Sequence, residues 1–244
     1  LKLGGDAKQI LSLLNEKLEQ QNHKECIEQI KAWKKEYPLR QEAIDPNGVT
    51  PQMLFDALNE LTKSEAIIAT EVGQHQMWAA QFYEFRHPRQ FITSGGLGTM
   101  GFGLGAAMGA QVANPDKKVI NIAGDGSFHM NCNELSTLAK YQIPMMELVV
   151  DNSVLGMVRQ WQKLFYDNRF SQTTQDKKTD FVKLAEAFGV KAFEIHTKDE
   201  LIPVLKEALG LKEPVLVACH IHRDFNVLPM VPAGASAEEP ILEM

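Results

Sequence analysis

The chain has 244 residues, 44% of them hydrophobic, which is enough for one large α/β domain or for a domain with an appendage. Its formal net charge is −6 and it carries no basic stripe, which argues against nucleic acid as a partner. No apolar run approaches about 18 residues, so the sequence predicts no segment that spans a membrane.

The chain opens at Leu1 with neither an initiator Met nor a signal peptide, and we expect it to begin inside a longer protein. Its three cysteines, Cys26, Cys132 and Cys219, show no CxxC or other paired spacing. Free thiols in a reducing compartment are the simplest interpretation, so we expect a cytoplasmic protein.

Two helices are predicted at the start of the chain, over residues 7–20 and 24–36, because apolar residues recur there at helical spacing and charges fill the other faces. Pro38 ends the second helix, and the Asp-Pro-Asn-Gly run at residues 45–48 is a turn or linker. We therefore expect residues 1–45 to form a helical connector.

An alternating pattern follows. Thr50 and Pro51 predict the N-cap and first turn of a helix that runs through Leu61. Strands are predicted over residues 66–70, 119–123, 145–150, 192–195 and 214–219. Further helices are predicted over residues 74–83, 101–112, 133–141, 157–166, 181–188 and 198–209. Because the inner strands are apolar on both faces, we predict an α/β fold over residues 46–220, a doubly wound, mostly parallel sheet with helices on both faces, followed by an irregular tail over residues 221–244.

Polar residues follow two of the predicted strands. Gly124-Asp125-Gly126-Ser127 comes after residues 119–123, and Asp151-Asn152 comes after residues 145–150. Strand ends at one edge of an open α/β sheet are where such folds bind ligands. An acid and an amide there suit a hard cation, and the glycines let backbone N–H groups approach a phosphate. The pattern predicts a metal–diphosphate site; the alternative is that the first stretch is an ordinary turn.

The spacing of the two stretches resembles the signature of thiamine diphosphate enzymes, in which GDG is followed by an Asn about two dozen residues later. The resemblance implies that Mg²⁺ is held by Asp125, Asn152 and the backbone carbonyl of Val154, and that the metal holds the diphosphate. Many relatives have Asn-Asn where this chain has Asp151-Asn152, but the ligand is the second residue. The residues that the resemblance places around the diphosphate and its metal are Asp125, Gly126, Ser127, Asn152, Ser153, Val154, Leu155, Gly156 and Met157.

Four more stretches narrow the resemblance. They are EVGQHQMW at residues 71–78, SGGLGTMGFGL at 94–104, LGMVRQW at 155–161 and LPMVPAG at 228–234. Together they resemble the catalytic subunit of acetohydroxyacid synthase, also called acetolactate synthase, over about residues 45–235. Gly105, where many relatives carry Pro, is a departure that should loosen the start of a helix.

The resemblance also assigns roles to single residues around the cofactor rings. It implies that Met100 lies beneath the bent thiamine diphosphate as a catalytic residue; the alternative is a core methionine. His75 has a structural histidine as its alternative. The residues implied to line this part of the cofactor are Gln74, His75, Gly98, Thr99 and Met100.

Two further roles lie at the edges of the implied site. The resemblance places Trp161 against the pocket for the second 2-oxoacid, as a second catalytic residue; packing against Leu164 and Phe165 is the alternative. It also implies FAD, a bystander in this family's reaction, in contact with Gln76, Met77, Gly95 and Gly96.

The implied activity is that of a transferase of branched-chain amino acid biosynthesis. It decarboxylates pyruvate and condenses the product with a second pyruvate or with 2-oxobutanoate. The family works as a homodimer or larger assembly whose active site is shared between subunits, with a possible small regulatory subunit. The alternatives are another thiamine diphosphate-dependent 2-oxoacid decarboxylase or oxidase, and a non-catalytic cofactor-binding module.

The resemblance makes residues 1–45 the end of a preceding FAD-binding domain. It also places the glutamate that activates the cofactor in a still earlier domain, and neither Glu71 nor Glu134 suits that role, so the chain by itself is expected to be inactive. His129, His220 and His222 show no ligand spacing in the sequence and are interpreted as structural.

Overall fold

The computed structural model describes residues 2–175 and 179–243, and the chain divides into two compact units, residues 1–40 and 41–244. The first unit holds the two predicted helices, α1 (Ala7–Lys17) and α2 (Lys24–Glu36). Asp6 caps α1 by accepting a hydrogen bond from the backbone N–H of Gln9. Neither helix buries any of its residues. The assignment of these residues to a FAD-binding domain stays a prediction.

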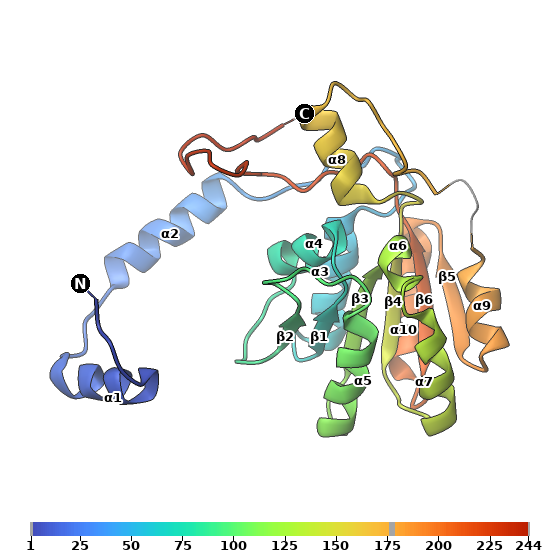
Figure 1. Cartoon of the computed structure of the whole chain (residues 1–244), viewed down its shortest axis with the longest axis horizontal. Helices are drawn as coiled ribbons and strands as arrows, with labels where there is room; N and C mark the ends of the chain where they lie inside the picture. The colour runs from blue at the N-terminus through green and yellow to red at the C-terminus, as the bar shows by residue number, and fades with distance from the viewer. Residues whose placement is uncertain (1, 176–178, 244) are drawn as a thin grey trace. The chain divides into compact units, whose positions relative to one another are not determined.

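The second unit is built on a sheet of six parallel strands in the order β2-β1-β3-β4-β6-β5 (Figure 1). The strands are β1 (Ile67–Thr70), β2 (Phe91–Thr93), β3 (Val119–Gly124), β4 (Met146–Asp151), β5 (Lys191–Ile195) and β6 (Val215–His220). Both β3 and β4 are buried along their whole length. A strand that is covered on both faces has no exposed side to fill with polar residues, which explains the apolar runs in the sequence.

Helices cover both faces of the sheet, as predicted. One apolar cluster joins it to α3 (Pro51–Thr62), α4 (Gln74–Phe82) and α10 (Lys198–Gly210). The opposite cluster joins it to α5 (Gly103–Ala113), α6 (Asp125–Phe128), α7 (Leu135–Tyr141) and α9 (Phe181–Ala187). A further helix, α8 (Gly156–Phe165), follows β4 and belongs to neither cluster. The doubly wound α/β fold is therefore confirmed.

Some elements differ from the sequence-based prediction. The short edge strand β2 was not predicted. Residues 125–127 form the single-turn helix α6 rather than a plain turn. Helix α5 begins at Gly103 instead of residue 101, because Gly101 adopts a φ of 87°, outside the helical region. A 3₁₀ turn, Cys132–Glu134, precedes α7.

None of the helices in the described part of the chain combines the length and apolar character needed to cross a membrane.

The strand order reverses at β1, because β2 lies on one side of it and β3 on the other. The carboxyl ends of β1, β3 and β4 lie next to one another at the same edge. In open α/β sheets the crevice at such a reversal is the usual ligand site. The topology therefore places a candidate site there.

One buried carboxyl group interrupts the apolar strands. Glu147 in β4 is fully buried and both of its oxygens accept hydrogen bonds from the Asn121 side chain in β3, at 3.0 and 2.9 Å. Burial raises the pKa of Glu147 well above its usual range, the Asn121 hydrogen bonds oppose this, and the charge of Glu71 adds to it. The folded protein therefore holds Glu147 as the neutral acid at pH values where the unfolded chain ionises it.

We predict that Glu147→Gln stabilises the protein at alkaline pH. Because the pKa is raised in the folded state, the free energy of unfolding is highest below the pKa of the unfolded chain and falls as the pH rises through the folded pKa. Glutamine keeps the shape and cannot ionise, and its N–H group can donate to the Oδ1 of Asn121, which has no other partner among the described residues. We therefore expect a gain of about 1–3 kcal/mol at pH 8, which disappears towards pH 4. Denaturant unfolding at both pH values measures this.

The exposed Glu186 offers a matched control, because Glu186→Gln changes the same chemical group outside the core. Equal stability of the wild type and Glu147→Gln at pH 8 would show that the Glu147 carboxyl carries no such strain.

Candidate functional site

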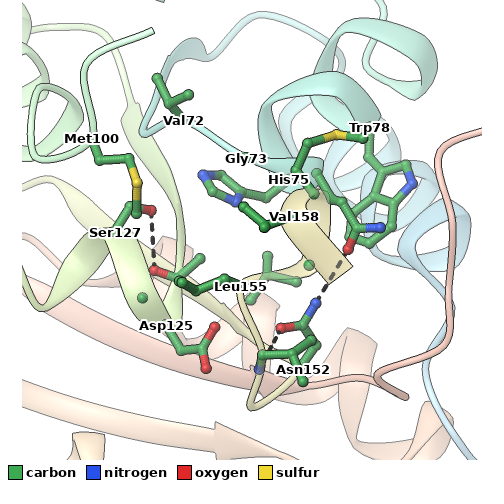
Figure 2. Close-up of a pocket in the computed structure, with 17 residues that line it drawn as sticks. Val72, Gly73, His75, Trp78, Met100, Asp125, Ser127, Asn152, Leu155 and Val158 are labelled. Atoms are coloured by element: carbon green, nitrogen blue, oxygen red, sulfur yellow. Dashed lines mark hydrogen bonds between the residues drawn. The ribbon is translucent and has the colours of Figure 1, made fainter. Parts of the chain in front are cut away.

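A hollow lies at the carboxyl ends of β1, β3 and β4 (Figure 2). Its walls are the turn before α4, the loop from Gly124 into α6, the loop between β4 and α8, and Met100. The residues predicted from the sequence that line it are Gln74, His75, Met100, Asp125, Gly126, Ser127, Asn152, Val154, Leu155, Gly156 and Met157.

Glycines allow the walls to come this close together. A Cβ atom at Gly124 would lie 2.7 Å from Nδ1 of His75, and one at Gly126 would lie 2.8 Å from Nε2 of Gln175. A Cβ atom at Gly156 would overlap the side chain of Gln74. Real Cβ atoms are not found at such distances, so a larger residue at these positions would have to displace the neighbouring side chain.

Two acids, Asp125 and Asp151, lie next to each other at the carboxyl ends of β3 and β4. Burial in the first place, and the charge of the neighbouring Asp151 in the second, raise the pKa of Asp125 to about 8. Burial also acts to raise the pKa of Asp151, but hydrogen bonds from His220 and Ser153 outweigh it and lower that pKa. A buried pair of acids that share one negative charge is relieved by a bound cation.

His75 contributes an unpaired nitrogen to the hollow. The residue is 5% exposed, and its Nε2 atom has no hydrogen-bond partner among the described residues. Burial lowers the pKa of His75 to about 3, so its ring is neutral at physiological pH. A structural histidine would have both nitrogens paired, so the orphaned Nε2 favours a ligand over that alternative.

A network of side-chain amides holds the α8 wall in place. Gln74 donates to Oε1 of Gln160 at 2.9 Å and to the carbonyl of Phe225 at 3.0 Å. Its own Oε1 accepts from Nδ2 of Asn152 at 3.3 Å. Gln160 is the buried residue of α8, and it exchanges two hydrogen bonds of 2.9 Å with the backbone of Val227. The C-terminal tail is thereby linked to the predicted metal ligand Asn152.

Comparison with known protein families fits this geometry. The model of the thiamine pyrophosphate enzyme C-terminal TPP-binding domain matches residues 71–219, which include all three loops around the hollow. The chain belongs to the thiamine pyrophosphate enzyme family.

Three individual relatives of this thiamine pyrophosphate domain are named acetolactate synthases. The mitochondrial acetolactate synthase catalytic subunit of Saccharomyces cerevisiae is 46% identical over 219 residues, covering 88% of this chain and 32% of the relative. The acetolactate synthase isozyme 2 large subunit of Escherichia coli is 41% identical over 240 residues, covering 97% and 42%. The acetolactate synthase large subunit of Lactococcus lactis is 45% identical over 195 residues, covering 80% of this chain and 34% of the relative. The chain thus spans about a third to two fifths of the length of these relatives.

The residues present fit a diphosphate bridged by a metal. Asp125 and Asn152 bring carboxylate and amide oxygens to one hollow, and Gly126 and Gly156 add no side chain of their own to it. The oxygen of the Asn152 side chain accepts from the N–H of Val154 at 3.1 Å. Oxygen ligands of this kind suit Mg²⁺. Which of these residues ligate stays a prediction.

Other predicted residues lie outside the hollow. Gly98 and Thr99 precede Met100 in a loop where the N–H of Thr99 donates to the Ser94 hydroxyl at 3.0 Å. Ser153 has a φ of 57° and donates to Asp151.

Trp161 is 42% exposed and contacts Phe165 edge to face, with ring centroids 5.4 Å apart. It is therefore not a core residue. It lies one helical turn beyond Met157 and Val158, which do line the hollow.

The residues predicted to touch FAD lie beyond the hollow, near the end of β2. Gln76 donates to the Thr93 hydroxyl at 2.7 Å, and a Cβ atom at Gly95 would contact the same threonine. Space around Gly96 is open, and Met77 is 37% exposed. Contact of these four residues with FAD remains a prediction.

Glu71 has a role that the sequence did not reveal. Its side chain is buried at the end of β1, where its two oxygens accept from the backbone N–H groups of Gly101 and Leu104. Burial raises the pKa of Glu71, while these backbone hydrogen bonds oppose the rise. Glu71 thereby holds the start of α5 against β1 and fixes the loop that carries Met100. An acid directly after a strand and before a glycine-rich loop is the signal that could have indicated this cap.

We predict that Glu71→Gln destabilises the fold by about 1–3 kcal/mol, because one of its two oxygens becomes an N–H donor that faces other donors. We also expect the affinity for thiamine pyrophosphate to fall, since the Met100 loop loses its anchor. Thermal melting and calorimetric titration measure the two effects. The exposed Glu84→Gln is the control; a Glu71 variant that melts like it would contradict the capping role.

Proposed function

We propose that the hollow binds thiamine diphosphate through Mg²⁺ and that the complete enzyme is an acetolactate synthase. The observation that carries the proposal is that Asp125, Asn152 and His75, whose Nε2 has no hydrogen-bond partner among the described residues, line one hollow. The resemblance to acetolactate synthases at 41–46% identity supports the narrower activity.

In this proposal the metal ligands are Asp125, Asn152 and the carbonyl of Val154. The backbone from Gly126 to Ser127 and from Ser153 to Met157 surrounds the diphosphate, where N–H groups at the starts of helices suit an anion. When bound, thiamine diphosphate supplies a carbon that stabilises the negative charge left when a 2-oxoacid loses CO₂.

The chain's own side chains prepare the site for that chemistry. The neutral ring of His75 offers a hydrogen-bonding nitrogen without adding a positive charge beside the metal. Met100, Leu155 and Val158 give the hollow apolar walls that exclude water from a reactive carbon. Gln74 and Gln160 fix the position of the Asn152 amide.

The finer parts of the proposal rest on the resemblance. Pyruvate is the donor, and a second pyruvate or 2-oxobutanoate is the acceptor, with Trp161 at the acceptor pocket. FAD is held in part by Gln76, Met77, Gly95 and Gly96. The complete enzyme is a homodimer or larger assembly that shares its active site between subunits and can carry a small regulatory subunit. A cytoplasmic location is proposed on the free cysteines instead.

The product of pyruvate turnover tests the activity. The complete enzyme, supplied with thiamine diphosphate, Mg²⁺ and FAD, should release acetolactate. Acetaldehyde would indicate a simple decarboxylase and acetyl phosphate an oxidase. Cofactor binding without turnover of any 2-oxoacid would favour the non-catalytic module.

We predict that Asp125→Asn weakens Mg²⁺-dependent binding of thiamine diphosphate by at least about 100-fold, since losing even an outer partner of a metal ligand costs about 10–100-fold. The reason is that the diphosphate then meets the site without the carboxylate that holds its counterion. Calorimetric titration of the complete enzyme measures the affinity.

The exposed Asp116→Asn is the matched control and should bind as the wild type does. An Asp125→Asn variant whose affinity equals that of this control would remove Asp125 from the metal site.

We predict that Trp161→Leu lowers the ratio of acetohydroxybutyrate to acetolactate formed from mixed pyruvate and 2-oxobutanoate by roughly tenfold or more. A pocket wall discriminates one methylene by about 1–3 kcal/mol, and leucine cannot replace the flat ring. Because Trp161 is 42% exposed, the melting temperature should change little. Phe165→Leu, on the same helix and equally exposed, is the control. An unchanged product ratio in a folded Trp161 variant would rule out the specificity role.

A further inference from the structure

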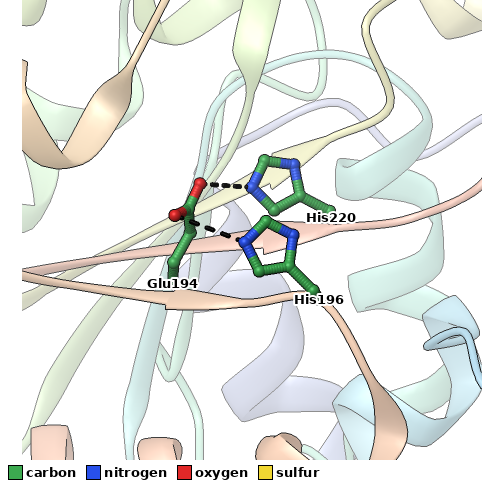
Figure 3. Close-up of side chains that lie close together, drawn as sticks. All are labelled: Glu194, His196 and His220. Carbon is green, nitrogen blue, oxygen red and sulfur yellow. Dashed lines mark hydrogen bonds and ion pairs between the residues drawn. The ribbon is translucent and has the colours of Figure 1, made fainter.

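A second group of possible metal ligands lies at the carboxyl ends of β5 and β6. Glu194 is in β5, His196 is the first residue after β5, and His220 is the last residue of β6 (Figure 3). Because Glu194 pairs with Ala218 and Ile195 with Cys219 in the sheet, His196 and His220 lie at the next matching positions. Residues two apart on a strand share a face, so all three side chains project from one side of the sheet.

The side chains converge closely. Nε2 of His220 lies 2.7 Å from Oε1 of Glu194, and Nε2 of His196 lies 3.3 Å from Oε2. The two imidazole rings are stacked 4.4 Å apart with an interplanar angle of 3°. One nitrogen from each ring and one carboxylate oxygen all lie within 4.8 Å of one another. Within the described residues, the ion pairs of Glu194 are with these two histidines.

The other nitrogen of His220 also faces a carboxylate. Nδ1 of His220 lies 3.1 Å from Oδ2 of Asp151, the residue paired with it on β4. When a histidine binds a metal, the ring nitrogen away from the ion almost always donates to a carboxylate or carbonyl. Asp151 therefore fixes the orientation in which Nε2 of His220 points at Glu194 and is available as a ligand.

We propose that Glu194, His196 and His220 form a second metal site that takes a borderline divalent ion, Zn²⁺ in the first place. Two imidazoles and one carboxylate are a ligand set typical of Zn²⁺ and unlike the all-oxygen set that Mg²⁺ prefers. In a tetrahedral site with bonds of about 2.0–2.2 Å, ligand atoms lie about 3.3–3.6 Å apart, so the two stacked rings have to tilt for both nitrogens to face one ion. Glu194 and His196 are exposed and free to move, and water completes the four ligands.

A bound ion at this position would also affect the predicted thiamine diphosphate site. His220 contacts both the proposed ion and Asp151, and Asp151 precedes the predicted ligand Asn152. The ion would hold the ends of β5 and β6 together and keep the partner of Asp151 in one orientation. The proposal itself is independent of the function proposed above, because its ligands are outside that hollow.

Zinc titration of the 244-residue chain tests the site. Competition with a chromophoric chelator, in saturating Mg²⁺ to fill the Asp125 site, should show tight binding of one Zn²⁺. His196→Ala and Glu194→Ala should each weaken that binding by more than about tenfold. Histidine ring signals in NMR spectra of the same samples should report Zn²⁺ at His196 and His220.

Two control variants distinguish this site from nonspecific binding of Zn²⁺ by other surface histidines. His87 faces both oxygens of Glu65 at 3.1 Å on another part of the surface, and His222 lies beside Asp224 two residues after His220. His87→Ala and His222→Ala should bind Zn²⁺ as the wild type does. Since His196 is exposed, its variant should remain folded, which thermal melting checks.

Three outcomes would overturn the proposal. The His196 and Glu194 variants could bind Zn²⁺ as tightly as the wild type. Zinc binding could disappear whenever Mg²⁺ is saturating, which would assign it to the Asp125 site. The ring signals of His220 could stay unchanged with Zn²⁺ present, which would leave a histidine held between two carboxylates as the whole role of the cluster.

Discussion

The parallel direction of all six strands is the constraint on which the rest of this structure depends. Every segment that leaves a strand at its carboxyl end starts at the same edge of the sheet, so residues far apart in sequence meet there. Asp125 and Asn152 become neighbours because β3 and β4 are paired, and His75 joins them because β1 is paired with β3. The apolar strands are thus more than a core, since their register positions the polar residues that follow them.

This arrangement concentrates buried polar groups at one end of the domain. Asp125, Asp151 and Glu71 are each at most 5% exposed, and each relies on a different partner. Backbone N–H groups at the start of α5 compensate Glu71, and His220 and Ser153 compensate Asp151. Asp125 keeps a raised pKa instead, which is the state expected of a carboxylate whose natural partner is a cation. The electrostatics of this edge therefore indicate a site selected for binding rather than for stability.

Much of this could be predicted from the sequence, because the signals are local. Apolar runs predicted five of the strands to within one or two residues, and Thr50-Pro51 correctly predicted the start of α3, where the Thr50 hydroxyl accepts from the N–H of Met53. Strand β2 was not predicted, because a run of only three residues shows no hydrophobic periodicity. The role of Gln160 in the amide network was not predicted, because its burial depends on Gln74 and on the tail around Val227, which are far away in sequence. Sequence spacing gave His220 no metal-binding role because only the insertion of β6 between β4 and β5 brings it beside Glu194 and Asp151.

The attachment of α8 affects how a ligand can enter and leave the hollow. Gln160 is the one residue that this helix buries, so hydrogen bonds rather than apolar area hold it to the domain. Water can replace such bonds at a small net free-energy difference, whereas separating the apolar layers on the two faces of the sheet exposes their cores. Local opening in proteins begins where little apolar surface would be exposed. Among the walls of the hollow, we therefore expect α8 to open most readily, while the buried Phe225 and Val227 keep the tail attached to the core and the sheet remains intact.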